Sequence, residues 1–122
     1  MADAYRRHGA LRERLHFQRR SSQTDGWGNT IPGAGPFETV FTVSASMTPR
    51  TGGEEVTAAR LGGRQPYIVR VRKMPAMNDV TVSWRIADAR NAGRLFNIAS
   101  PLSDPDGKNQ WLEFLAIEGV PS

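Results

Sequence analysis

Cysteine is absent from the 122-residue sequence, and histidine and lysine are scarce, with two of each. The absence of cysteine excludes a disulfide framework and a thiolate metal site, and it fits a reducing compartment. His8 and His16 have no carboxylate at ligand-type spacing, so we expect solvated surface side chains. No run approaches the roughly 20 apolar residues of a membrane-spanning helix, so we expect no membrane partner.

Motifs for catalysis and cofactor binding are also missing. No glycine-rich run leads into Lys-Ser or Lys-Thr, and no dinucleotide-binding fingerprint follows an expected strand. Asp104, Asp106 and Asn109 resemble part of a calcium loop, but the glycine is misplaced and no glutamate stands at the twelfth position. Glu54 and Glu55 are adjacent and have no evident acid–base partner. We therefore predict no enzyme, no cofactor and no metal site.

Arginine carries almost all of the positive charge. The formal net charge is +4, with 14 arginines against two lysines. The planar guanidinium suits phosphate and carboxylate partners, although codon usage in a GC-rich genome explains the bias equally well. Residues 1–14 are predicted to form a basic N-terminal arm. The arginines of this arm are candidate partner contacts: Arg6, Arg7, Arg12 and Arg14.

Alternation of apolar and polar residues with a period of two predicts an all-β fold. The clearest pattern runs from Phe37 to Met47, where every second residue is expected to face a core. The last strand is apolar on both faces, as expected of a central or interface strand. A hairpin is expected after residue 86, with a positive φ at Asn91 or Gly93. The expected strands cover residues 15–20, 37–47, 67–72, 80–86, 94–100 and 111–118.

Turn-forming residues separate these strands, so residues 15–120 are predicted to form a single domain. Its expected architecture is a small antiparallel β-barrel or sandwich of about six strands. The second and third strands are joined by a polar connection, residues 48–65. Because hairpin loops usually run about two to five residues, a connection of this length is either functional or disordered.

A second segment rich in turn formers, residues 21–36, contains Trp27. An aromatic side chain in a polar loop usually folds back onto its own domain, and less often it anchors a partner. Trp27 is therefore a candidate partner contact, with the core as the alternative.

Several arginines occupy the polar faces of the later expected strands. Arg70 and Arg72 project from one strand, and Arg85 and Arg94 could extend that face across the next hairpin. Such a row could face a phosphate backbone, or it could be a solvated outer face with scattered ion pairs. Single-strand binding barrels usually add exposed aromatics, whereas Phe41, Trp84 and Phe96 are expected in the core. This leaves a nucleic-acid-binding β-barrel as an alternative function.

Short motifs follow one another in a characteristic order over residues 11–118. They are Leu11, Arg14, Leu15 and Phe17 before Arg19; Asp25-Gly26; Val43-Ser44-Ala45; Gly53-Glu54-Glu55 and Ala58-Ala59; Val69-Arg70-Val71-Arg72; Gly93-Arg94-Leu95-Phe96-Asn97-Ile98; and Leu112-Glu113-Phe114. In this order the chain resembles the phage head–tail joining family, the stopper or head-completion proteins of long-tailed phages and gene transfer agents. The family often has Trp-Ala at Val43-Ser44-Ala45 and tyrosine at Phe96.

The resemblance implies a small β-barrel that assembles as a ring, of six copies, at the head–tail junction of a virion or virus-like particle. Its partners would be the portal or adaptor protein, the tail terminator or tail tube protein, and double-stranded DNA. Such particles assemble in the bacterial cytoplasm. A tail-terminator or minor tail subunit of the same particle is the alternative within this class.

The resemblance also implies that residues 48–65 line or close the DNA channel. Two glycine pairs in this segment could act as hinges, and the positions of its glutamates and of Arg60 suit a short helix between those pairs. The candidate channel residues are Arg50, Gly52, Gly53, Glu54, Glu55, Arg60, Gly62, Gly63 and Arg64.

Overall fold

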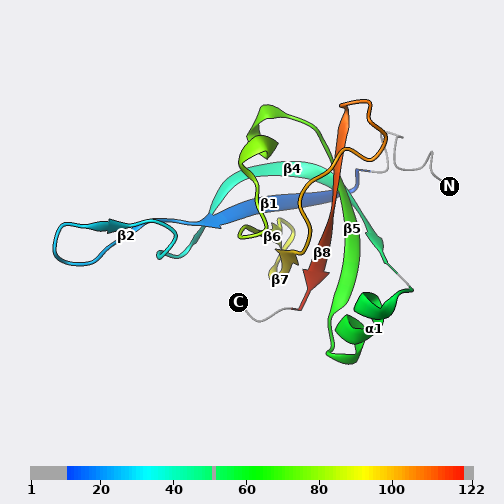
Figure 1. Cartoon of the computed structure of the whole chain (residues 1–122), viewed down its shortest axis with the longest axis horizontal. Coiled ribbons are helices and arrows are strands. Elements are labelled where there is room, and N and C mark those ends of the chain that lie inside the picture. Colours follow the sequence, from blue (N-terminus) through cyan, green and yellow to red (C-terminus); the bar gives the residue numbers. More distant parts are fainter. Residues whose placement is uncertain (1–10, 51, 120–122) are drawn as a thin grey trace.

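The computed structural model describes residues 11–50 and 52–119, and its longer strands close into a six-stranded antiparallel barrel (Figure 1). The elements are β1 (Glu13–Arg20), β2 (Gln23–Thr24), β3 (Thr30–Ile31), β4 (Phe37–Pro49), α1 (Glu54–Leu61), β5 (Gln65–Arg72), the 3-10 helix η3 (Pro75–Asp79), β6 (Arg85–Asp88), β7 (Asn91–Ile98) and β8 (Trp111–Glu118). The barrel order is β1-β4-β5-β8-β7-β6, and β6 pairs with β1 to close it. The predicted all-β class is confirmed.

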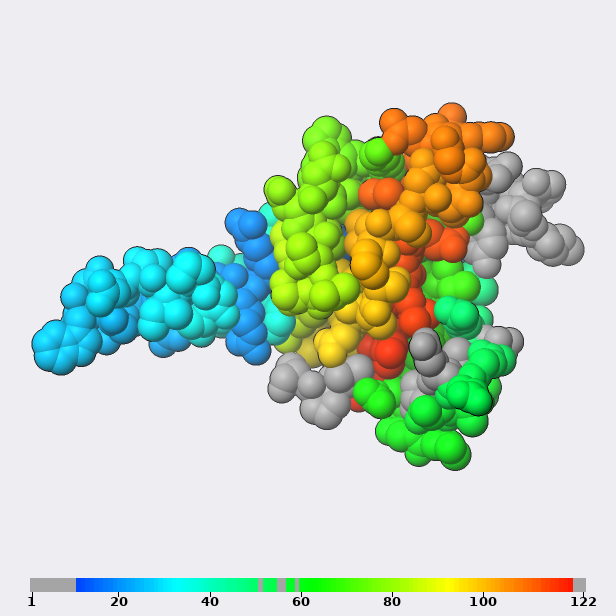
Figure 2. All heavy atoms as spheres, in the orientation of Figure 1, coloured from blue at the N-terminus to red at the C-terminus, as the bar shows by residue number. Residues whose placement is uncertain are grey.

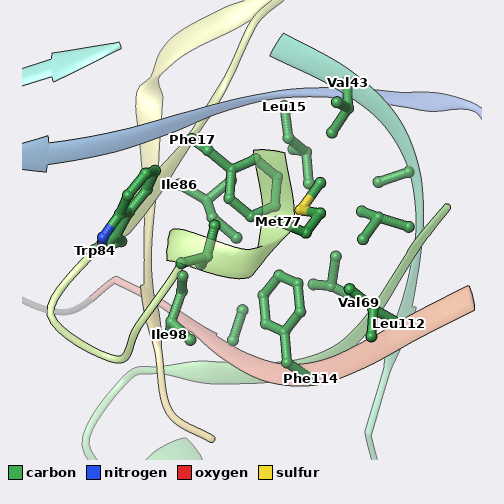
Figure 3. Packing of buried hydrophobic residues seen from close by; sticks show 14 of the residues in the cluster. Leu15, Phe17, Val43, Val69, Met77, Trp84, Ile86, Ile98, Leu112 and Phe114 are labelled. Atoms are coloured by element: carbon green, nitrogen blue, oxygen red, sulfur yellow. The ribbon is translucent and has the colours of Figure 1, made fainter. Parts of the chain in front are cut away.

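The inward-facing side chains of the barrel form one hydrophobic core (Figure 3). Alternate residues on each strand supply it, as a period of two requires. Leu15 and Phe17 on β1 and Val69 and Val71 on β5 are completely buried. Met77 reaches in from η3 and is only 2% exposed. The 3-10 helix therefore contributes to the same core as the strands.

β8 is the central strand that its sequence predicted. It is hydrogen-bonded to β5 on one side and to β7 on the other. Its core-facing residues are Leu112, Phe114 and Ala116. The alternate residues Leu115 and Ile117 are partly exposed on the outside of the barrel. The second apolar face of β8 is thus an outer surface.

The alternation in β4 is interrupted near its start. The register with β1 shifts there, because Phe17 pairs with Phe41 whereas Gln18 pairs with Thr39, so Val40 is the extra residue of a bulge. Val40 is exposed, and Phe37 and Thr39 do not join the core cluster. The expectation that Phe37 and Thr39 face the core is therefore wrong.

The strand expected over residues 80–86 is also wrong in its first half. A turn that follows η3 occupies this part, with the Trp84 N–H donating to the Thr81 carbonyl at 3.1 Å, and β6 begins only at Arg85. Val80 and Trp84 are buried, but Val82 is 54% exposed. Val80 and Trp84 both reach the core from a turn, so their even spacing resembles that of a strand although Val82 between them is exposed.

The hairpin between β6 and β7 is tighter than predicted. Asp88 pairs with Asn91, so the turn is Ala89–Arg90, and neither Asn91 nor Gly93 has a positive φ. The Asp88 carboxylate accepts a hydrogen bond from the Arg90 N–H at 2.8 Å. Side-chain capping by an aspartate therefore replaces the expected left-handed residue.

Residues 21–36 project from the barrel (Figure 1). They are called the arm below and are distinct from the N-terminal arm of residues 1–14. At its base the Ser21 N–H donates to the Pro36 carbonyl at 2.9 Å, and the Gly35 N–H donates to the Ser21 carbonyl at 2.7 Å. Farther out, β2 pairs with β3 in a separate two-stranded sheet. The turn-rich segment is thus an ordered hairpin that continues outward from β1 and β4.

Candidate interaction sites

The connection between β4 and β5 carries the helix that its sequence suggested. Thr48 and Pro49 still belong to β4, and α1 occupies Glu54–Leu61. The Thr57 N–H and hydroxyl both donate to the Gly53 carbonyl at 3.1 Å, which holds the first turn. Glu54 begins the helix and Arg60 lies in its last turn, so both charges complement the helix dipole.

Glycine is required at both ends of this connection. Gly52 and Gly53 have φ values of 88° and 90°, and Gly63 has a φ of 79°, all in the left-handed region. Gly62 is not among the glycines with a positive φ. Its N–H donates to the Ala58 carbonyl at 3.2 Å, which extends the hydrogen bonding of the helix. Gly52, Gly53 and Gly63 therefore have backbone conformations that favour glycine, and their role as hinges stays a prediction.

The two stems of the connection are fastened to each other. The Arg50 N–H donates to the Pro66 carbonyl at 3.0 Å, and Gln65 Nε2 donates to the Arg50 carbonyl at 3.4 Å. Arg50, Arg60 and Arg64 form no ion pair with any residue whose side chain the structure describes. The Glu55 side chain lies outside that description. Among the described side chains, these three arginines around α1 therefore lack a carboxylate partner.

An open depression lies between α1 and the outer face of β8. It has a volume of about 580 Å³ and is lined by Arg50, Gly52, Gly53, Glu54, Pro66, Ala99, Leu115 and Ile117. A second depression of about 400 Å³ shares Arg50, Ala99 and Leu115 with it. Together they form one groove, called the outer groove below. Its floor is apolar because β8 exposes the side chains opposite to those that fill the core.

Trp27 lies at the tip of the arm and is 88% exposed. The expectation that it folds back onto the core is therefore wrong. The tip is nevertheless ordered, because Asp25 accepts from the Trp27 N–H at 2.7 Å, from the Asn29 N–H at 3.2 Å and from Asn29 Nδ2 at 3.1 Å. These bonds, the Trp27 N–H first, lower the pKa of Asp25. The tip therefore presents one aromatic side chain beside a carboxylate that stays ionised.

The basic N-terminal arm is only partly described. Arg6 and Arg7 lie outside the described residues, and Arg12 and Arg14 are exposed. Arg14 Nη1 donates to Ser44 Oγ at 3.2 Å. The structure thus brings Arg14 against β4, and the predicted role of these arginines as partner contacts stays a prediction.

The arginines of the outer face are engaged within the barrel. Arg70 forms an ion pair with Glu113 at 2.6 Å, and the Arg72 guanidinium carbon lies 4.9 Å from the Trp111 ring centroid. Arg85 Nε donates to Gln18 Oε1 at 2.7 Å, and the Arg85 guanidinium lies over the Phe37 ring at 4.1 Å. A partly paired outer face therefore describes these residues better than a free row of phosphate contacts.

Arg94 is the centre of the strongest polar cluster. Its Nε donates to Glu118 Oε2 at 2.7 Å, its Nη2 donates to Glu118 Oε1 at 3.0 Å, and Asp88 lies 3.4 Å from Nη1. The hydrogen bonds from Arg94 lower the pKa of Glu118. Burial and the neighbouring Glu118 raise the pKa of Tyr67, whose hydroxyl donates to Glu118 Oε1 at 3.2 Å. The cluster ties β7, β8 and β5 together at one end of the barrel.

The described residues hold no cluster suited to a metal ion, since they contain no group of three or more acidic or histidine side chains placed to hold one. Within the same ranges, no helix is long and apolar enough to cross a membrane. Trp84 and Phe96 are buried as expected, and Phe41 is partly buried and stacks on Phe17 at 5.0 Å. None of these three rings is a free stacking platform for bases.

Two solved structures have a similar fold. The solution structure of a protein from Shigella flexneri 2a matches with a TM-score of 0.66 and 24% identity, over 94% of this chain and 98% of that chain. A chain of the virion of a native gene transfer agent particle matches with a TM-score of 0.58 and 20% identity, over 89% of this chain and 94% of that chain. At these identities the likeness shows the barrel fold alone. No curated protein matches the sequence.

The sequence profile of phage head completion proteins matches residues 6–119. This match spans the barrel, the arm and the connection that contains α1, and it agrees with the order of motifs along the chain. The chain belongs to the phage head completion protein family.

Proposed function

We propose that this chain forms a ring of six copies that joins a DNA-filled head to a tail and helps to retain the packaged DNA. Membership of the family assigns the chain a structural role in a virion, at the head–tail junction. Proteins of this family are not normally enzymes, which agrees with the absence of catalytic motifs from the sequence. The ring, its size and the retention of DNA are the parts that need an experiment.

The observation that carries this proposal is the family match over residues 6–119, taken with the connection between β4 and β5. That connection holds a short helix between left-handed glycines, and its three arginines lack ion-pair partners among the described side chains. A channel segment that meets DNA needs positive charge and defined hinge points. We propose that α1 and its flanking residues line or close the channel.

The portal or adaptor protein and the tail terminator or tail tube protein are the proposed neighbours of the ring, and double-stranded DNA passes through it. The experiment is assembly of particles without this chain. Heads that lack tails or lose DNA are the expected result. Intact tailed particles that keep their DNA would refute the proposal.

A loop variant tests the channel role separately. Deleting residues 53–62 removes α1, while the stems remain joined through Arg50, Gln65 and Pro66. We expect a folded protein that joins heads to tails but gives particles that lose DNA, measured by nuclease-accessible DNA. Val82→Ala, at an exposed site on a different loop, is the control and should keep DNA enclosed. An unfolded deletion variant would show instead that the connection is structural.

A further inference from the structure

The exposed arm and the outer groove lie on different sides of the molecule. The arm extends to one side of the barrel, and α1 with the start of β5 lies on the other (Figure 1). Figure 2 shows the arm as a narrow projection that leaves the compact body. The outer groove lies beside α1, so the arm points away from the groove of its own chain. The two features can meet only between different copies.

We propose that Trp27 at the tip of the arm seats in the outer groove of the next copy, so that each chain both gives an arm and receives one. This inference rests on the proposed ring and names the surfaces that build it. A contact between two different patches is heterologous, and heterologous contacts generate closed rings when the rotation closes. The arm and the groove are such a pair.

The chemistry of the two surfaces is complementary. The exposed apolar surface of the groove floor comes from Ala99, Leu115 and Ile117, and the volume of about 580 Å³ lies in the range of pockets that hold whole ligands. A tryptophan ring suits an apolar floor and needs an acceptor for its indole N–H when it is buried. Glu54 at the groove rim can accept that hydrogen bond, and Arg50 beside it can meet the ionised Asp25 of the tip.

The arm is also built as a contact element. Its tip is fixed by three hydrogen bonds to Asp25, so little conformational freedom is lost on docking. A two-stranded hairpin is marginally stable alone, and this one is fastened to the barrel only at its base. Ile31 on β3 is also exposed and would add apolar area beside Trp27. Tryptophan is enriched among the residues that dominate binding at protein interfaces.

Docking in the outer groove would act on the channel segment. Arg50, Gly52, Gly53 and Glu54 line the groove and also lead into α1. An arm seated there would hold the start of α1 in place. Ring closure and the position of the channel helix would then be set by the same contact.

The absence of cysteine allows a direct test by disulfide cross-linking. Thr30→Cys places a thiol near the tip, and Ala99→Cys places one in the groove; both sites are exposed. A chain with both substitutions is oxidised as concentrated purified protein and in tailed particles. We expect a ladder of linked chains that ends at the ring size. The Thr30→Cys, Lys108→Cys chain is the matched control and should give no ladder, because Lys108 lies in the exposed turn before β8, away from the groove.

Trp27 itself reports the contact by fluorescence. Trp84 and Trp111 are each 5% exposed, so Trp27 is the tryptophan that acrylamide reaches in the free chain. Assembly should blue-shift its emission and reduce its quenching. Trp27→Ala should weaken self-association by about thirty-fold or more, the scale of an interface hot spot, while Val82→Ala should leave it unchanged.

Absence of the Thr30–Ala99 link from both purified protein and tailed particles would overturn the inference. Linkage of Thr30→Cys chains through their own tips would also overturn it, because that result shows an isologous contact. So would a Trp27 that is shielded only when a head protein, a tail protein or lipid is added. These outcomes leave the proposed function standing. That function fails on a different result, the formation of intact tailed particles without the chain.

Discussion

Phe96 shows how far single core residues can be assigned from the sequence. It shares a face with Ile98 and Arg94 in the expected strand, it was expected in the core, and it is 1% exposed in the barrel. Trp84, which was also expected in the core, is 5% exposed, and Phe41 is partly buried against the same cluster. The assignment failed at Phe37 because a bulge at Val40 shifts the alternation, and a bulge leaves no signal in a pattern of two.

Truncating Phe96 should be strongly destabilising. Phe96→Ala leaves a cavity in a closed core and is expected to lower the free energy of unfolding by about 3–5 kcal/mol. Urea unfolding followed by far-UV circular dichroism measures this difference. Leu61→Ala is the control, because Leu61 is 85% exposed, and its effect should stay within about 0.5 kcal/mol. A small effect at Phe96 would show that the barrel core repacks.

The ion pair between Arg94 and Glu118 was beyond prediction from sequence. The two residues are 24 positions apart, and they meet only because β7 and β8 are neighbours in a particular register. Neither the strand order nor the register can be deduced from alternation. The same holds for Arg70 with Glu113, which lie directly opposite each other on β5 and β8.

This pair gives a pH dependence with a defined sign. Because Arg94 lowers the pKa of Glu118 below its ordinary value of 4.5, the pair stabilises the fold above pH 4.5 and loses that contribution as the pH falls through the folded pKa. A double-mutant cycle with Arg94→Gln and Glu118→Gln should therefore give a coupling energy at pH 7 that shrinks towards pH 2–3. Equal coupling at both pH values would contradict the assignment.

At the scale of elements, strand positions were predicted better than their connections. The strand patterns around β1, β5 and β8 agree with the structure to within about two residues, and the positions of the glutamates and of Arg60 correctly suggested α1. The arm was not predicted as a hairpin, because β2 and β3 have only two residues each and no apolar alternation. The turn-forming residues indicated a turn at the tip of the arm, but no pattern indicated the two short strands beside it.

The connection around α1 should tolerate alanine unequally at its glycines. Gly53 has a φ of 90°, so Gly53→Ala is expected to cost about 1–2 kcal/mol of stability although no atom blocks the new methyl group. Gly62→Ala should be neutral or slightly stabilising, because its φ is ordinary for an L-residue. Chemical denaturation of both variants measures the difference. Equal costs would mean that α1 is not held in this conformation.

The base of the arm has a steric requirement rather than a conformational one. A methyl group at Gly35 would lie 2.8 Å from the Ser21 carbonyl oxygen and 2.9 Å from that of Ser22. Gly35→Ala should therefore open the arm while leaving the barrel folded. Amide exchange should rise in residues 21–36 only. Gly93→Ala, whose new methyl group meets only the Asn91 side chain at 3.4 Å, should leave the arm unchanged. Exchange that rises throughout the barrel would show that the arm is part of its stability.

For the whole molecule, the distribution of charge argues against strong binding of DNA by a free subunit. Arg70 and Arg94 are paired with carboxylates, Arg72 and Arg85 lie over aromatic rings of the barrel, and Arg50, Arg60 and Arg64 around α1 have no ion pair with a described side chain. Many such segments would face DNA together only in a ring.

The isolated chain should therefore bind double-stranded DNA weakly, and more weakly still as salt rises from 50 to 200 mM. Fluorescence anisotropy of labelled DNA measures this. Assembled rings are the matched comparison and should bind more tightly than the same concentration of free subunits. Tight binding by the free chain with a steep salt dependence would favour a nucleic-acid-binding barrel instead.

β4 is a single strand of 13 residues that begins at the base of the arm and ends at the stem of the α1 connection. At about 3.3 Å per residue it spans roughly 40 Å, and it is hydrogen-bonded to β1 over most of its length and to β5 near its end. A pull on the arm along this direction loads those bonds in parallel, as shear, rather than one after another. Mechanical strain at one end of the subunit would therefore reach the other end with little loss in the barrel between them.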